Sequence, residues 1–122
     1  MASQPTTVLV VDDEPSIREF LSEVLMDAGY VVRTAPHGRA ALTDVETAPP
    51  NLVLSDVFLP QLDGWSLAAE LRRRFPAVQV VMMSAYRPDF AVGRMRFIAK
   101  PFDLDALLAL VADSVDPAGC FR

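Results

Sequence analysis

The chain has 122 residues, a formal net charge of −5 and an isoelectric point near 4.7. This length fits one domain with a substantial core, and the acidic balance argues against a nucleic-acid partner, which requires a basic face. No apolar run approaches the roughly 20 residues of a membrane span, the first residues lack a secretory signal, and the single cysteine, Cys120, cannot form an internal disulfide, so we expect a cytoplasmic protein.

Short apolar runs alternate with segments of helical period along the whole chain. The predicted strands lie at 7–11, 30–35, 51–55, 78–84 and 95–99. The predicted helices lie at 15–28, 38–47, 65–74 and 103–114, and the second of them is short. This alternation predicts an α/β fold with a parallel sheet and helices on both faces. We expect a domain over 1–116 and a short tail over 117–122.

The first predicted helix carries a broad apolar stripe, and Gly29 follows it as the expected stop. The residues placed on this stripe are Ile17, Phe20, Leu21, Val24, Leu25 and Ala28.

Polar residues follow four of the five predicted strands at the point where each strand ends. They are Asp12 and Asp13, Asp56, Ser84 and Lys100. In a parallel sheet the carboxyl ends of the strands meet at one edge, where functional groups gather. The sequence therefore predicts that these five side chains share one site.

Three neighbouring carboxylates require a cation, and ligands that offer only oxygen select a hard ion such as Mg²⁺, with Mn²⁺ as an alternative. Because Mg²⁺ also bridges to phosphoryl oxygens, the cluster indicates phosphate chemistry, with a carboxylate attacking phosphorus to give an aspartyl phosphate. The ammonium group of Lys100 and the hydroxyl of Ser84 are suited to bind phosphoryl oxygens. A helix cap is the plainer interpretation of Asp12 and Asp13, and it is compatible with ligation.

Four segments, "VVDDEP", "LSDVFLPQLDG", "VVMMSA" and "AKPF", resemble in order and spacing the bacterial response-regulator receiver domain over about residues 6–114. The resemblance implies a flavodoxin-like, doubly wound five-stranded sheet of order 2-1-3-4-5. It implies that Asp56 accepts a phosphoryl group from a histidine kinase or phosphotransfer protein. It also implies that Asp12, Asp13, Asp56 and the backbone carbonyl of Phe58 hold Mg²⁺.

The resemblance further assigns Ser84 and Phe97 to the conformational switch, although Phe97 is also explained as plain core. In the family, the positions that Phe58 and Tyr86 hold here border the path of the hydrolytic water; both residues are bulky, so we expect slow loss of phosphate. Lys100-Pro101 matches a peptide bond that is often cis in the family. His37 has no companion ligand and is expected at the surface, and Asp63-Gly64 is expected to form a turn and a helix cap.

We expect a signalling domain that catalyses only its own phosphorylation and dephosphorylation. Two alternatives are an enzyme that forms an aspartyl phosphate, which would need a D-x-D pair that Asp56-Val57-Phe58 lacks, and a degenerate receiver that only binds partners. The downstream partner or effector is open, as is the choice between a stand-alone receiver and part of a longer regulator.

Only fifteen residues separate Ser84 from Lys100, and they must supply a loop, a helix, a second loop and a strand. A strand takes about 5 residues and each loop about 2–6, which leaves about one helical turn. We therefore expect the fourth helix of the family to be shortened or absent here. A homodimer would then not use the usual fourth-helix face, and signalling would fall to another surface such as the first helix.

Overall fold

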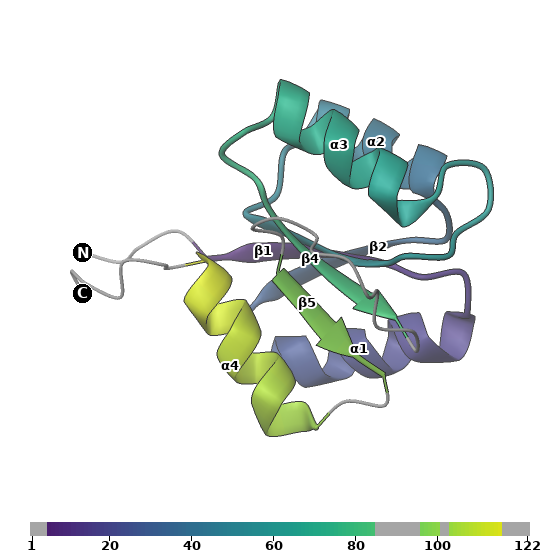
Figure 1. The fold of residues 1–122 in the computed structure, drawn as a ribbon. Helices are drawn as coiled ribbons and strands as arrows, with labels where there is room; N and C mark the ends of the chain where they lie inside the picture. Colours follow the sequence, from purple (N-terminus) through teal and green to yellow (C-terminus); the bar gives the residue numbers. More distant parts are fainter. Residues whose placement is uncertain (1–4, 85–95, 101–102, 116–122) are drawn as a thin grey trace.

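The computed structural model describes residues 5–84, 96–100 and 103–115, and within them strands and helices follow one another in the order that the sequence predicts (Figure 1). In chain order the elements are β1 (Thr7–Val11), α1 (Pro15–Asp27), β2 (Val31–Ala35), α2 (Gly38–Thr47), β3 (Leu52–Asp56), α3 (Gly64–Arg74), β4 (Gln79–Ser84), β5 (Arg96–Ala99) and α4 (Leu104–Val115). Their bounds lie within one or two residues of the predicted ranges.

The five strands form one parallel sheet in the order β2-β1-β3-β4-β5, as the resemblance implied. The register aligns Val11 with Ser55, so Asp12 and Asp56 follow paired positions at the same end of the sheet. On the far side of β4, Ser84 aligns with Ala99, and the Lys100 amide donates to the Ser84 carbonyl at 2.8 Å. This register carries polar residues distant in sequence to one edge.

Helices cover both faces of the sheet, with α2 and α3 on one face and α1 and α4 on the other (Figure 1). Side chains alternate along β1, so Val8 and Val10 pack beneath α1 and α4 while Leu9 and Val11 pack beneath α2 and α3. All four are fully buried. Burial on both faces explains why the strands read as continuous apolar runs rather than alternating ones.

The apolar stripe of α1 is narrower than the sequence predicts. Leu21 and Leu25 are fully buried and Ile17 is half-buried, but Phe20 is 45% exposed and Ala28 is exposed. Phe20 lies beside Leu21 around the helix, and only the central line of the stripe meets the sheet. The predicted stop at Gly29 is confirmed, because this residue has a φ of 102° and its amide donates to the Met26 carbonyl.

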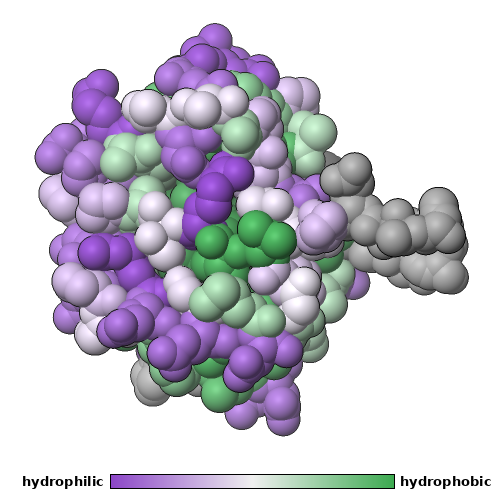
Figure 2. Space-filling model, turned by 180° about the vertical axis from the view of Figure 1, so that it is seen from behind, coloured by the Kyte–Doolittle hydropathy of each residue, from purple (hydrophilic) through white to green (hydrophobic). Residues whose placement is uncertain are grey.

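The face of the molecule shown in Figure 2 is mostly polar. Figure 2 looks onto the molecule from the side opposite to Figure 1, where β2 forms the sheet edge, and shows a small hydrophobic area surrounded by hydrophilic side chains. Among the described residues, the exposed large apolar side chains are Phe20, Met26, Val31, Phe58 and Leu104. None of the described helices is long and apolar enough to cross a membrane.

Several expectations concern residues outside the described ranges. These are the role of Tyr86, the shortened or absent helix between Ser84 and Lys100, the Lys100-Pro101 peptide bond, and the tail at 117–122 with Cys120.

Candidate functional site

Three carboxylates meet at the carboxyl edge of the sheet. Asp12 and Asp13 follow β1, and Asp56 ends β3. One oxygen from each lies within 4.8 Å of the other two. Asp12 is fully buried, Asp56 is partly buried and Asp13 is exposed, so the cluster reaches from the interior to solvent.

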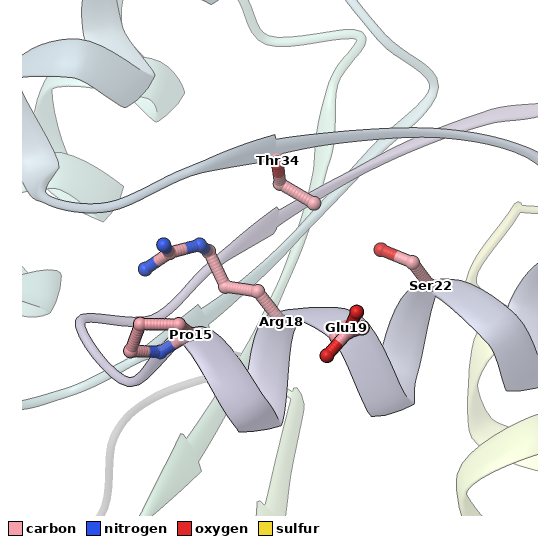
Figure 3. Close-up of a pocket in the computed structure, with 5 residues that line it drawn as sticks. All are labelled: Pro15, Arg18, Glu19, Ser22 and Thr34. Carbon is pink, nitrogen blue, oxygen red and sulfur yellow. The ribbon is translucent and has the colours of Figure 1, made fainter.

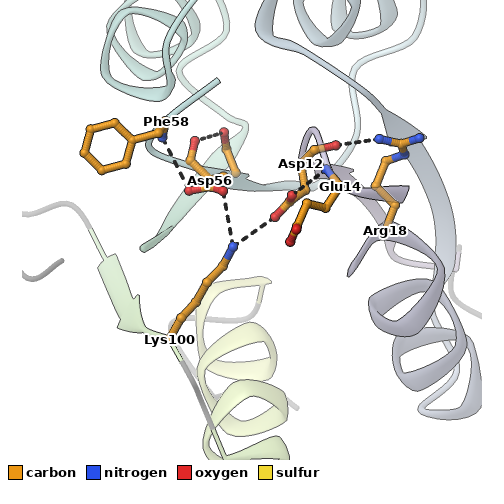
Figure 4. A network of polar contacts seen from close by, with 7 residues as sticks. Asp12, Glu14, Arg18, Asp56, Phe58 and Lys100 are labelled. Carbon is orange, nitrogen blue, oxygen red and sulfur yellow. Dashed lines mark hydrogen bonds and ion pairs between the residues drawn. The ribbon is translucent and has the colours of Figure 1, made fainter. Parts of the chain in front are cut away.

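Lys100 extends from the end of β5 into this cluster (Figure 4). Its Nζ donates to Asp12 Oδ2 at 3.1 Å and to Asp56 Oδ2 at 3.2 Å. The lysine side chain is 21% exposed, so these ion pairs are shielded from bulk water more than ordinary surface pairs. A single ammonium group thus balances two carboxylates that would otherwise repel each other.

Burial and charge act on these groups in opposite directions. Burial raises the pKa of Asp56 above its ordinary value; the neighbouring Lys100 charge opposes this shift, and the Asp12 charge adds to it. For Lys100, burial acts to lower the pKa, but hydrogen bonds and charge from Asp12 and Asp56 outweigh burial and raise it. The two carboxylates therefore stabilise the charged Lys100 ammonium group, and Asp56 is more basic than an exposed aspartate.

Backbone contacts fix the carboxylates in place. The Glu14 amide donates to Asp12 Oδ1 at 2.9 Å, and the Phe58 amide donates to Asp56 Oδ1 at 3.3 Å. Arg18 Nη1 donates to the Asp12 carbonyl at 2.7 Å, which ties α1 to the end of β1. Arg18 was not predicted from the sequence, since an arginine on the first turns of an amphipathic helix carries no distinctive signal.

The remaining predicted residues lie around this core. Ser84 is buried at the end of β4, and its backbone carbonyl accepts a hydrogen bond from the Lys100 amide. Phe97 is half-buried and packs, as Trp65 does, against a cluster of Val57, Ala68 and Met82 on the α3 face of the sheet. Phe58 is 63% exposed, and its ring points away from Lys100 (Figure 4).

The loop between β3 and α3 is tightly constrained. The Leu62 amide donates to the Pro60 carbonyl at 2.8 Å around Gln61, whose φ of 69° makes this a γ-turn. The Gly64 amide closes the loop at its base by donating to the Val57 carbonyl at 2.8 Å. Asp63 caps α3 by accepting from the Ser66 amide at 2.9 Å, as the sequence predicts for a turn and cap.

A pocket of about 340 Å³ lies beside the cluster, between α1 and β2 (Figure 3). It is lined by Pro15, Arg18, Glu19, Ser22 and Thr34, and none of the clustered carboxylates nor Lys100 contributes to it. Its polar lining residues are half-buried or exposed, so it is a surface hollow separate from the carboxylates.

Raising the pH above about 10.5 is expected to destabilise the metal-free protein. Because the pKa of Lys100 is raised above its ordinary value of 10.5, the native state retains this proton more strongly than the unfolded chain, and stability falls as the pH rises through the native pKa. Urea unfolding between about pH 9 and 11.5 measures this loss.

Burial also raises the pKa of Tyr30, whose ionisation adds a loss in the same direction. Lys100→Met should therefore be less stable than wild type at pH 9, and its unfolding free energy should fall less as the pH rises to 11.5. Tyr30→Phe should still show the fall in unfolding free energy that is due to Lys100. An identical decline in wild type and Lys100→Met would show that the lysine contributes nothing.

The sequence matches the response regulator receiver domain over residues 8–112. The DNA-binding transcriptional regulator NtrC of Salmonella typhimurium is 35% identical over 114 residues, which cover 88% of this chain and 24% of NtrC. The response regulator protein FleR of Pseudomonas aeruginosa is 39% identical over 111 residues, which cover 86% of this chain and 24% of FleR. The chain thus spans about a quarter of the length of these relatives.

Solved structures agree with this assignment. The chemotaxis response regulator CheY4 of Vibrio cholerae shares 31% identity and superposes with a TM-score of 0.82, over 91% of this chain and 99% of CheY4. The receiver domain of NtrX from Brucella abortus shares 34% identity with a TM-score of 0.83, again over 91% and 99% of the two chains. This chain belongs to the response regulator receiver family of two-component signalling.

Proposed function

We propose that Asp56 is the residue that accepts the phosphoryl group. The observation that carries this proposal is the position of its carboxylate, which contacts Lys100, lies within 4.8 Å of those of Asp12 and Asp13, and is partly buried at the end of β3. Asp12 is fully buried and held by both Lys100 and the Glu14 amide, which leaves Asp56 as the partly accessible carboxylate in contact with the lysine.

The proposed donor is a phosphohistidine of a histidine kinase or phosphotransfer protein. An Asp56 carboxylate oxygen attacks phosphorus, an O–P bond forms, and the P–N bond to the imidazole breaks. The imidazole leaves with the bonding electron pair and takes up a proton from solvent. The product is an aspartyl phosphate, and water later reverses the modification by attacking phosphorus.

The chain offers a fitting set of oxygen ligands for Mg²⁺, with Mn²⁺ as an alternative. Asp12, Asp13 and Asp56 supply carboxylates within 4.8 Å of one another, and the Phe58 backbone carbonyl is the proposed fourth protein ligand. The ion would neutralise charge on the phosphoryl oxygens. Lys100 would then pair with a phosphoryl oxygen on the other side, where its Nζ already lies against Asp56.

Signalling would follow from a rearrangement at the neighbouring strand ends. Ser84 would bind a phosphoryl oxygen through its hydroxyl, and Phe97 on β5 would change its packing in response. Because the phosphoryl group is transferred to the domain's own aspartate, its output would be a binding event with a further protein or a linked effector. In NtrC and FleR the segment similar to this chain is about a quarter of a longer regulator.

Exposure to a small phosphodonor should label the protein in a Mg²⁺-dependent way. Acetyl phosphate should give an alkali-labile increase in mass, and beryllofluoride with Mg²⁺ should change the fluorescence of Trp65, the single tryptophan of the chain. Both responses should disappear when EDTA removes the metal. A protein that binds Mg²⁺ but remains unlabelled and unresponsive would be a binding scaffold rather than a working receiver.

Phe58→Asn is expected to accelerate loss of the phosphoryl group, by up to about tenfold or about 1.4 kcal/mol in the barrier. Phe58 is 63% exposed and its backbone amide contacts Asp56, so we propose that its bulky side chain can cover the acceptor from the solvent side. In-line attack requires space for water opposite the carboxylate oxygen. Dephosphorylation is followed by mass spectrometry after the donor is removed.

The matched control for this change is Phe20→Asn, which replaces a second exposed phenylalanine, one that lies on α1. It should leave the rate unchanged. Tyr86→Ala tests the second proposed bulky position and should accelerate the loss in the same direction. An unchanged rate in Phe58→Asn would contradict the steric explanation.

A further inference from the structure

Gly38, the first residue of α2, lies directly against the loop between β3 and α3. A Cβ atom on this glycine would lie 1.8 Å from the Leu62 carbonyl oxygen and 2.7 Å from both the Leu62 carbonyl carbon and its Cβ. The φ of Gly38 is not in the left-handed region, and alanine has the higher helix propensity. Space rather than backbone conformation therefore requires glycine here.

The Leu62 backbone cannot move without the rest of its loop, because hydrogen bonds join the residues of this loop to one another. Leu62 is bonded within the γ-turn around Gln61, and the base of the loop is joined by the Gly64 amide and the Val57 carbonyl. Gly64 in turn abuts Asp56, since a Cβ on Gly64 would lie 2.3 Å from the Asp56 carbonyl oxygen. A displacement of Leu62 would thus be passed to the short segment that contains Phe58.

Helix α2 is the other partner of the contact, and it is held firmly. Its own residues Ala41 and Val45 are fully buried and pack against the sheet. Near its far end, Arg33 on β2 donates from Nε to Asp44 Oδ2 at 2.9 Å and from Nη2 to the Ala48 carbonyl. Movement of the loop is therefore easier than retreat of the helix.

We infer that Gly38 is a positioning residue for the metal site, because its backbone contact with Leu62 fixes the loop that carries the Phe58 carbonyl. This inference rests on the proposed function, in which that carbonyl and the three carboxylates hold Mg²⁺. A side chain at position 38 would push the loop by more than about 1 Å to restore ordinary contact distances. Metal ligation tolerates displacements of only a few tenths of an ångström.

Gly38→Ala tests the inference, with Gly29→Ala as its control. Gly29 has a φ of 102° and no atom within 4 Å of the position that a Cβ would take, so alanine there strains the backbone without a collision. Both variants should unfold at lower urea concentration than wild type. Only Gly38→Ala should bind Mg²⁺ more weakly, by about tenfold or more, as measured by calorimetry on the folded proteins.

The outcomes separate the inference from the proposed function. Wild-type Mg²⁺ affinity in a folded Gly38→Ala protein would overturn the role of Gly38 and leave the metal site standing. A wild-type protein that binds no Mg²⁺ would overturn the metal site and the inference together. Equal weakening in Gly29→Ala would show that lower stability alone causes the effect, which also overturns the inference.

If Gly38→Ala does not fold, hydrogen exchange on the wild type decides. The Ala40 amide, which donates to His37 Nδ1 at 3.1 Å, reports on the start of α2, and the Ala48 amide, which donates to the Asp44 carbonyl at 3.0 Å, reports on its end. Saturating Mg²⁺ should slow exchange at Ala40 more than at Ala48. Equal slowing at the two amides would overturn the inference.

Discussion

Asp56→Asn is expected to abolish phosphoryl labelling by acetyl phosphate or a cognate kinase while the fold is retained. The amide is isosteric with the carboxylate but lacks the nucleophilic oxygen, and it keeps an oxygen that can accept from the Phe58 amide. Lys100 retains Asp12 as a partner. Labelling is measured by mass spectrometry and the fold by circular dichroism.

The same substitution is expected to maintain or increase the stability of the metal-free protein at pH 7. Because burial raises the pKa of Asp56, the native state binds its proton more tightly than the unfolded chain, so stability falls as the pH rises from about 3.8 through the native pKa. Asparagine has no such loss. The part of the loss of unfolding free energy between pH 4 and pH 7 that comes from position 56 should therefore be smaller in Asp56→Asn than in wild type, as measured by urea unfolding.

Asp63→Asn is the matched control for the labelling experiment. Asp63 lies in the loop that follows Asp56 and caps α3, and asparagine caps helices about as well as aspartate. This control should label like wild type. Undiminished labelling of Asp56→Asn, or loss of labelling in Asp63→Asn, would place the acceptor elsewhere.

The sheet and the clustering of its polar ends were predictable because both follow from general rules. Continuous apolar runs that alternate with helical segments specify a parallel sheet, and a parallel sheet brings its carboxyl ends together. Asp12, Asp56 and Lys100 accordingly lie within contact distance, although Lys100 is distant in sequence from both. Sequence order alone is sufficient for this step.

The degree of burial within the cluster was not predictable. Asp12 and Asp13 are adjacent in sequence, yet Asp12 is fully buried and Asp13 is exposed, because successive side chains leave the strand end in different directions. Phe20 shows the same limit on α1, where helical period identifies a stripe but does not give the width that meets the sheet.

Contacts between loops and helix ends were also missed. His37 was expected at the surface, but it is half-buried and caps α2 through Nδ1, a role that sequence patterns reserve for serine, threonine, aspartate and asparagine. Gly38 meets Leu62 through backbone atoms from a different segment. Such contacts depend on how α2 packs beside α3, and no local periodicity encodes that packing.

Asp13 offers the clearest separation between metal binding and fold stability. Within the described part of the chain, its side chain has no hydrogen bond or ion pair, while an oxygen of this exposed carboxylate lies within 4.8 Å of those of Asp12 and Asp56. Asp12, by contrast, is fully buried and accepts hydrogen bonds from the Glu14 amide and from Lys100. The two neighbours should therefore respond differently to the same substitution.

Asp13→Asn is expected to leave the unfolding free energy of the metal-free protein within about 0.5 kcal/mol of wild type, as for an exposed residue without partners. Its Mg²⁺ affinity should fall by at least about tenfold, because a charged ligand is lost. At a Mg²⁺ concentration of about 100 times the wild-type Kd, bound metal should stabilise wild type by about 2.7 kcal/mol, and the variant by at least about 1.3 kcal/mol less.

Asp12→Asn is the comparison that completes this experiment. It should lower stability by about 1–3 kcal/mol even without metal, because a buried, hydrogen-bonded charge that pairs with Lys100 is removed. Urea unfolding with and without Mg²⁺ measures both quantities for each variant. If Asp13→Asn kept the full Mg²⁺-dependent stabilisation, its carboxylate would not be a ligand, and the metal would have to be held by Asp12 and Asp56 without it.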